Sequence, residues 1–202
     1  MKVSPFKFSK FSWASIAIAA LFALFIVAAG VRASDEKKDN TATTPPKVGE
    51  TAPDFRLPYA TQEAIHLKPE EYMALSSLRG KNVILAFYPA DWSGGCTKEV
   101  CTLRDTFAEL SKLNATVLGV SGDYVFSHQE WAKFHKLQFP LLSDHDHKIA
   151  RLYGSYNETV GFNNRTVFLI DKDGVVRYSN LQFKAGDPND YSKLKEELAK
   201  LN

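Results

Sequence analysis

The chain has 202 residues, of which 45% are hydrophobic and 24% are charged, and it holds only two cysteines. This composition excludes an intrinsically disordered chain and a scaffold built on several disulfides, and the length favours one globular domain. The net charge of +2 argues against a dedicated nucleic-acid-binding protein, which would carry a strongly basic patch or stripe.

The N-terminal 33 residues predict an export signal or a membrane anchor. They contain four basic residues and no acidic one, so the remaining 169 residues carry 21 basic and 23 acidic side chains. Between Lys10 and Arg32 lie 21 uncharged residues with an almost wholly apolar centre at 16–29, long enough to span a bilayer. Val31 and Ala33, before Ser34, also fit the small-residue rule for a signal-peptide cleavage site. A cleaved signal and a retained anchor therefore both remain open. The lysines precede the apolar run, and basic residues stay on the cytoplasmic side of a membrane. The N-terminus is therefore expected in the cytoplasm, and everything after residue 33 on the far side, in a periplasm or an equivalent compartment.

Residues 34–47 are polar, contain proline and lack aromatic side chains, which is typical of a flexible linker. The globular domain is expected over residues 48–202. Its first half predicts a β-α-β unit, because two short apolar runs, 82–88 and 115–120, are rich in β-forming residues. Between them, residues 97–113 carry apolar side chains at helical spacing.

The second half of the domain predicts two further helices, a hairpin and a terminal helix. Residues 127–137 are amphipathic, with Trp131 and Phe134 expected in the core, and a short apolar stretch follows before a short helix. A turn signal between two β-rich runs predicts a β-hairpin. This order predicts an α/β fold with a mixed central sheet flanked by helices on both faces. The segments are the apolar stretch 139–142, the short helix 149–153, the strands 165–171 and 175–178, and the helix 190–201.

The loop between the first strand and its helix carries the strongest chemical signal. Cys96 falls in the first turn of the helix, where free N–H groups and the positive end of the helix dipole favour an anion. The thiol is therefore expected to be shifted toward the nucleophilic thiolate. Gly94 and Gly95 let the backbone approach closely and leave its amides free for a ligand oxygen, and Ser93 can offer its hydroxyl to the same space.

Cys101, five residues after Cys96, limits how the two thiols can react with each other. On a continuous helix, residues five apart are separated by about 140° of rotation and by roughly 8.7 Å between Cα atoms. A disulfide needs Cα atoms within about 7 Å, so the first turns of the helix would have to unwind. The spacing favours a cysteine that is first oxidised by a small molecule and is then resolved by its partner after local unfolding.

The same loop resembles a known family. Pro89, Ser93 and Cys96 match the peroxiredoxin signature Pro-x-x-x-Thr/Ser-x-x-Cys, and the Cys-x-x-x-x-Cys continuation resembles the Q-type subfamily, also called bacterioferritin comigratory proteins. Segments that begin at Val48, Leu78, Pro140 and Arg165 resemble further peroxiredoxin segments in the same order. The resemblance implies a thioredoxin-like fold and the reduction of hydrogen peroxide and organic hydroperoxides without a cofactor.

By this resemblance, Cys96 would be the peroxidatic cysteine, which attacks the O–O bond and becomes a sulfenic acid. Cys101 would resolve it to an intramolecular disulfide, and a thioredoxin-like thiol donor on the same side of the membrane would reduce that disulfide. No cysteine follows Cys101, so the C-terminal resolving cysteine of dimer-linked relatives is absent and a monomer is expected.

The resemblance also assigns four positioning roles. Arg165 would lie beside the thiolate, favour it by its charge and polarise the peroxide. Glu99 would orient Arg165, Ser93 would donate a hydrogen bond to the peroxide, and Pro89 would shield the pocket. Serine at 93 is a permitted variant of the commoner threonine, whereas Trp92 is less typical of the family.

Two other functions remain open from the sequence. An exported thiol–disulfide exchange protein would use the same two cysteines without peroxide. A copper-handling protein of the same fold would use a Cys-x-x-x-Cys pair, and the spacing here is one residue longer. The alternating acids and histidines at 144–147 predict a helix cap and solvated surface rather than a metal site. The other histidines, His66, His128 and His135, carry no pattern.

Overall fold

The computed structural model describes residues 44–202. The predicted signal or anchor, and residues 34–43 of the predicted linker, lie outside these residues. No helix within 44–202 is long and apolar enough to cross a membrane.

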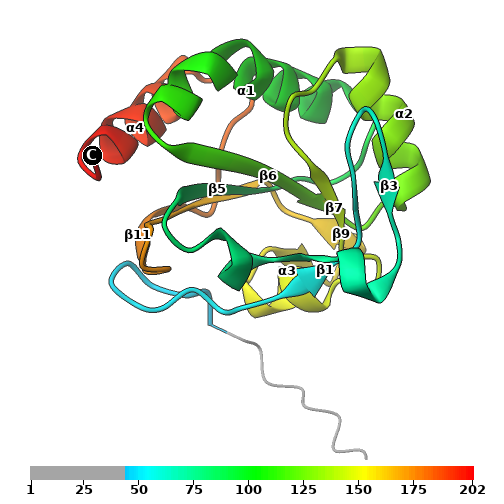
Figure 1. Cartoon of the computed structure of the whole chain (residues 1–202), viewed down its shortest axis with the longest axis horizontal. Helices are drawn as coiled ribbons and strands as arrows, with labels where there is room; N and C mark the ends of the chain where they lie inside the picture. The colour runs from blue at the N-terminus through cyan, green and yellow to red at the C-terminus, as the bar shows by residue number, and fades with distance from the viewer. Residues whose placement is uncertain (1–43) are drawn as a thin grey trace, which may run out of the picture. The chain divides into compact units, whose positions relative to one another are not determined.

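A seven-stranded mixed sheet forms the centre of the domain, in the order β11-β10-β5-β6-β7-β2-β3 (Figure 1). The three strands β5, β6 and β7 are parallel, and every other neighbouring pair is antiparallel, which confirms the predicted mixed sheet. In sheet order the strands are β11 (Val176–Asn180), β10 (Thr166–Ile170), β5 (Asn82–Phe87), β6 (Ala115–Ser121), β7 (Leu141–Ser143), β2 (Tyr59–Ala60) and β3 (Ile65–His66).

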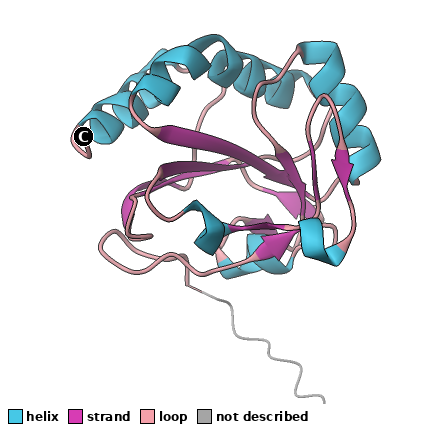
Figure 2. Ribbon diagram, in the orientation of Figure 1, coloured by secondary structure: helices cyan, strands magenta, loops and turns pink. Residues whose placement is uncertain are grey.

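Helices cover both faces of this sheet (Figure 2). Three of them, α1 (Gly94–Lys112), α2 (Val125–His135) and α4 (Pro188–Ala199), pack on one face, and α3 (Lys148–Leu152) packs on the other. Strand β5 is buried on both sides. The Ile84 and Ala86 side chains belong to the core beneath α1, α2 and α4, and the alternate side chains of β5 belong to the core on the α3 side. The strand that leads into the cysteine loop is therefore fixed at the middle of two apolar cores.

The shortest elements are the ones that the sequence did not predict. Strands β2 and β3 extend one edge of the sheet, and two separate two-stranded sheets lie outside it. Elements of two to four residues are too short to show a hydrophobic period. They are β1 (Arg56–Leu57) with β4 (Met73–Ala74), β8 (Tyr156–Asn157) with β9 (Phe162–Asn163), and the 3-10 helices η1 (Pro69–Glu71) and η2 (Leu75–Leu78).

The boundaries of the longer elements follow local capping. Helix α1 begins three residues before the predicted segment because the Ser93 hydroxyl oxygen accepts the N–H of Cys96. Helix α2 ends at His135 because Lys136 has a left-handed backbone, with φ of 54°. In the predicted hairpin turn, the Asp171 carboxylate accepts two backbone N–H groups and Gly174 has φ of 78°, a region that favours glycine.

The prediction that Phe134 lies in the core is wrong. Trp131 is fully buried as predicted, but the Phe134 side chain is 71% exposed. Phe134 lies at the edge of the apolar stripe of α2, and its ring packs instead against the ring of Trp92 in the cysteine loop, with 5.7 Å between the centroids.

The acid–histidine run before α3 contains the predicted cap. The Asp144 carboxylate accepts the N–H groups of Ile149 and Ala150, while His145 and Asp146 are exposed. Asp144 itself is buried rather than solvated, because those two hydrogen bonds satisfy its oxygens.

Candidate active site

Cys96 lies at the third position of α1, directly beyond the carboxyl end of the central strand β5. Its side chain is fully buried and its thiol is free. The Ser93 hydroxyl oxygen accepts the Cys96 N–H at 3.4 Å, and the same hydroxyl donates to the Ala90 carbonyl oxygen at 3.1 Å. Ser93 thus fixes both the start of the helix and the curvature of the loop before it.

Arg165, one residue before β10, reaches across to this helix end. Strand β10 pairs antiparallel with β5, so its first residues lie beside the last residues of β5. One guanidinium nitrogen, Nη2, lies 3.5 Å from Cys96 Sγ, and the other, Nη1, forms an ion pair with Glu99 Oε2. A Cβ atom at Gly95 would lie 3.1 Å from Arg165 Nη2, so the absence of a side chain there permits this approach. The structure therefore brings Cys96, Glu99 and Arg165 together.

Burial sets the protonation behaviour of Glu99. Its side chain is completely buried, and this raises its pKa to about 7 although the charge and hydrogen bond of Arg165 act in the opposite direction. The second oxygen, Oε1, has no hydrogen-bond partner within residues 44–202. Burial would lower the pKa of Arg165, but the charges of Glu99 and Cys96 outweigh it and the pKa is raised. Arg165 is thus a permanent cation beside the sulfur.

A Glu99→Gln variant is expected to change the pH dependence of stability. Between the ordinary pKa of 4.5 and the folded value of about 7, the native state holds a proton that the unfolded state has lost, so stability falls as the pH rises. At about 1.4 kcal/mol per pH unit, the free energy of unfolding of the wild type should fall by about 3 kcal/mol relative to the glutamine variant across this window. Chemical denaturation at several pH values measures the difference.

The control for this experiment is the exposed Glu109→Gln variant. Lys195 lowers the pKa of Glu109, so the ionised Glu109 stabilises the fold more as the pH rises. The stability of the wild type relative to Glu109→Gln should therefore not fall between pH 4.5 and 7. A difference between wild type and Glu99→Gln that stays constant from pH 4.5 to 7 would contradict the expected behaviour of Glu99.

Pro89 and Cys101, the remaining two predicted residues, are not part of this hydrogen-bonded group. Pro89 is half-buried in the loop between β5 and α1. Cys101 is half-buried on α1 with a free thiol, and α1 is continuous between the two cysteines. The Cys101 sulfur contacts a side chain of α2, since His135 Nδ1 lies 3.6 Å away.

A buried histidine–carboxylate hydrogen bond behind the cysteine loop was not predicted. His128 on α2 and Asp91 in the loop are both buried, with 2.9 Å between His128 Nδ1 and Asp91 Oδ2. The Tyr88 hydroxyl donates to Asp91 Oδ1 and the Ser127 hydroxyl donates to Asp91 Oδ2, each at 2.8 Å. The other ring nitrogen of His128, Nε2, lies 3.2 Å from the Leu142 carbonyl oxygen. Both ring nitrogens of His128 thus lie within hydrogen-bond distance of a partner in the fold.

A His128→Leu variant is expected to lose stability. It would remove a hydrogen-bond partner of the buried Asp91 carboxylate, which costs about 1–3 kcal/mol in the free energy of unfolding. Because Asp91 lies in the loop that leads to Cys96, the reaction with peroxide should slow as well. Denaturant unfolding and peroxide consumption measure the two effects. The half-buried His66→Leu variant on β3 is the control, with an expected change of at most about 1 kcal/mol.

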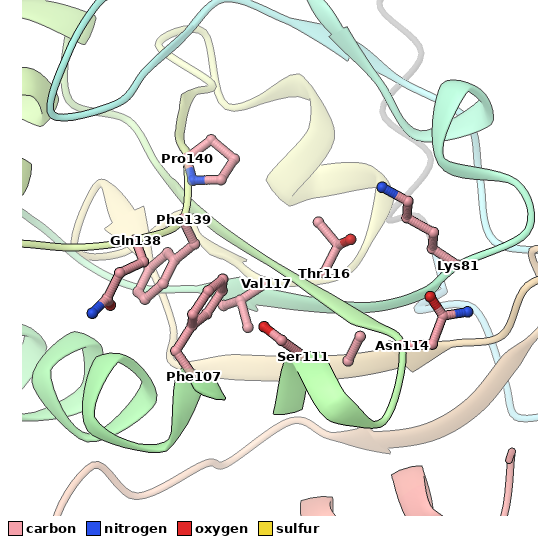
Figure 3. Close-up of a pocket in the computed structure, with 10 residues that line it drawn as sticks. Lys81, Phe107, Ser111, Asn114, Thr116, Val117, Gln138, Phe139 and Pro140 are labelled. Carbon is pink, nitrogen blue, oxygen red and sulfur yellow. The ribbon is translucent and has the colours of Figure 1, made fainter. Parts of the chain in front are cut away.

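Two pockets differ in their relation to these residues. A pocket of about 310 Å³ is lined by Asn164, Arg165, Leu181, Gln182 and Phe183, and so opens beside the guanidinium that contacts Cys96. A second pocket, of about 280 Å³, lies at the opposite end of the parallel strands, where Lys81 and Asn114 precede β5 and β6 (Figure 3). None of the predicted site residues lines the second pocket. In the part of the chain that the structure describes, no cluster of three or more histidine, cysteine or carboxylate side chains could hold a metal ion.

Comparisons with known proteins agree with the resemblance in the sequence. The AhpC/TSA family matches residues 48–179. A putative peroxiredoxin bcp of Coxiella burnetii is 43% identical over 136 residues, which cover 64% of this chain and 85% of that protein. A chloroplastic peroxiredoxin Q of Oryza sativa subsp. japonica is 38% identical over 138 residues, which cover 67% of this chain and 60% of that protein.

Among solved structures, the peroxidoxin BcpB of Mycobacterium tuberculosis superimposes with a TM-score of 0.67 and 31% sequence identity. The superposition covers 78% of this chain and 99% of that one. A crystal structure of Enterococcus faecalis AhpC superimposes with the same TM-score at 24% identity, so it is similar to this chain in fold. These matches confirm the predicted thioredoxin-like α/β fold.

Proposed function

This chain belongs to the AhpC/TSA family of peroxiredoxins, and from this premise we propose that it reduces hydroperoxides through Cys96, with Cys101 as an intramolecular resolving cysteine. The observation that carries the proposal is the position of the buried Cys96 sulfur. It lies at the N-terminal end of α1 and 3.5 Å from the Arg165 guanidinium. A helix N-terminus and a fixed cation both favour the thiolate, which is the nucleophilic form.

In the first step, the Cys96 thiolate attacks one peroxide oxygen. An S–O bond forms, the O–O bond breaks, and the leaving oxygen takes up a proton and departs as water or an alcohol. The sulfur is oxidised by two electrons and becomes a sulfenic acid. Arg165 supplies N–H donors and positive charge where the leaving oxygen becomes negative, and Glu99 holds the guanidinium in that direction.

In the second step, the Cys101 sulfur displaces the sulfenic oxygen as water and forms the disulfide. Residues 96 and 101 lie on the same unbroken helix, and the first turns of α1 must unwind before the two sulfurs can meet. The proposal therefore includes a local unfolding step between the two chemical steps.

The partners of this cycle are part of the proposal. An intramolecular disulfide is returned to two thiols by an external dithiol, so a thioredoxin-like protein is the expected donor. Since both redox cysteines lie on one helix, no second subunit is needed for the cycle, and we expect a monomer. The location across a membrane, whether soluble or tethered, depends on residues 1–33, outside the described part of the chain.

A single-turnover experiment tests the proposal. The reduced protein is mixed with one equivalent of hydrogen peroxide, and tryptophan fluorescence, intact mass and peptide mass are followed. The half-exposed Trp92, in the loop before Cys96, is the expected reporter, and a Trp92→Phe variant identifies its signal. We expect both thiols to be lost rapidly, with a crosslink between Cys96 and Cys101.

The Cys101→Ser variant separates the two steps. It should still react with peroxide but should stop at a Cys96 sulfenic acid, which a dimedone-type reagent traps. Thiols that survive for minutes in the wild type would contradict the peroxidase. Reduction of insulin disulfides by such a protein would then favour a thiol–disulfide exchanger, and copper retained after desalting would favour a copper-handling protein.

A further inference from the structure

The resolving cysteine has a partner that the family motif does not include. Cys101 Sγ lies 3.6 Å from His135 Nδ1, within hydrogen-bond distance for sulfur, although the residues are 34 positions apart in the chain. Cys101 projects from α1 and His135 is the last residue of α2. The contact pairs a thiol with an imidazole nitrogen, the arrangement in which a base activates a nucleophile.

The surroundings hold the His135 ring in place. Its imidazole meets the ring of Trp131 edge-on, and the rings of Phe134 and Trp92 pack on it from other directions. The Arg104 Nη1–H donates to the His135 carbonyl oxygen at 2.7 Å, which ties the end of α2 to α1. Partial burial, and then the positive charge of Arg104, lower the pKa of His135. The ring is therefore neutral at neutral pH, and one of its nitrogens can accept a proton.

The two cysteines differ in how the fold can activate them. Cys96 lies in the first turn of α1, beside the Arg165 guanidinium. Cys101 is the eighth residue of the same helix, where the effect of the helix terminus has declined. The thiolate is the attacking form in disulfide formation, so a base in contact with Cys101 would assist the resolving step.

We propose that His135 is the general base that accepts the Cys101 proton when this sulfur attacks the Cys96 sulfenic acid, an inference that rests on the peroxidase function proposed above. In this step the S–S bond forms and the S–O bond of the sulfenic acid breaks. The Cys101 proton passes to His135 Nδ1, the sulfenic oxygen leaves as hydroxide and takes up a proton to become water, and the imidazolium returns its proton to solvent. The Cys101 sulfur is oxidised and the Cys96 sulfur is reduced, so atoms and electrons balance.

The position of the contact also sets the order of events. The Cys101–His135 contact exists while α1 is still helical, before the two sulfurs can meet. The base is therefore already beside Cys101 when the first turns of α1 begin to unwind, and it is in place to accept the proton as the sulfur attacks the sulfenic acid.

The test uses a His135→Asn variant, whose amide can form a hydrogen bond near Nδ1 but cannot take up a proton. The reduced protein is mixed with one equivalent of hydrogen peroxide between pH 5.5 and 9.5, and acid-quenched samples are analysed by mass for sulfenic acid and disulfide. We expect oxidation of Cys96 within about twofold of wild type. Disulfide formation at pH 7 should be at least about tenfold slower, and the two rates should converge at high pH, where hydroxide can take the proton in place of the imidazole.

Two controls separate base catalysis from packing. Phe134→Ala removes a ring beside His135 but keeps the base, and His66→Asn changes a histidine that stacks on Tyr59 rather than on the Cys101 side of α2. Neither should change the pH profile of disulfide formation. An unchanged rate in His135→Asn, or slowing by the same factor at every pH, would overturn the role of His135 while leaving the peroxidase intact. A wild-type Cys96 that peroxide does not oxidise would instead overturn the proposed function itself.

Discussion

A Cys96→Ser variant is expected to lose peroxide consumption completely, by at least about a thousandfold. The serine hydroxyl is almost fully protonated at neutral pH even beside a cation, so the nucleophile is absent although the helix start and Arg165 remain. The buried position is filled by a side chain of similar size, and the fold should be kept. Peroxide consumption with a dithiol reductant, followed in a continuous assay, measures the loss.

Cys101→Ser is the matched control for this prediction. It removes the other thiol of the chain but should still consume one equivalent of peroxide in the first turnover. If Cys96→Ser retained peroxide consumption and Cys101→Ser lost it, the roles of the two cysteines would be reversed. If both variants retained it, neither thiol would be the site of peroxide reduction.

Replacing Arg165 by methionine is expected to slow the reaction of Cys96 with peroxide by about a hundredfold or more. The change removes the cation and the N–H donor that face the sulfur, and the loss of one such donor has about this effect in other enzymes. It also leaves the Glu99 carboxyl buried without its partner, so the variant should be less stable, most of all above pH 7 where Glu99 would otherwise be ionised. Stopped-flow fluorescence and chemical denaturation measure the two effects.

The double variant Arg165→Met with Glu99→Gln separates the two roles of Arg165. The glutamine removes the charge that Arg165 compensates, so stability should be largely recovered, whereas the rate with peroxide should remain low. Recovery of the rate as well would show that Arg165 acts only by holding Glu99 in place. Arg165→Lys should give an intermediate rate, because a lysine keeps the charge but not the planar pair of donors.

The parts of the site that sequence alone could place are those with a local signal. Ser93 and Cys96 lie within one loop and the first turn of α1, where a glycine pair and a helical pattern lie next to each other in the sequence. Arg165 and Glu99 are distant from each other in the chain, and they were placed by motifs in the family resemblance rather than by spacing. The structure brings them into contact because β10 pairs with β5.

The parts that sequence alone could not place depend on contacts between elements. His128 and His135 carry no pattern in the sequence, and their partners become visible only when α2 packs against the loop and α1. The error at Phe134 has the same cause, since helical spacing places it near the apolar stripe but only the fold shows that it lies exposed, with its ring against Trp92. Two residues per strand are also too few for β2 and β3 to be detected.

The last turn of α2 is tied to α1 at Arg104, whose Nη1–H donates to the His135 carbonyl oxygen. An unwinding of α1 that begins at Gly94 would meet this tie at Arg104. The unwinding on oxidation would then be confined to the residues of α1 that precede this tie. The oxidised and reduced proteins would therefore have different surfaces around one helix end and the same surface elsewhere. A thiol donor could distinguish spent from active enzyme by shape, at the place where the disulfide is exposed.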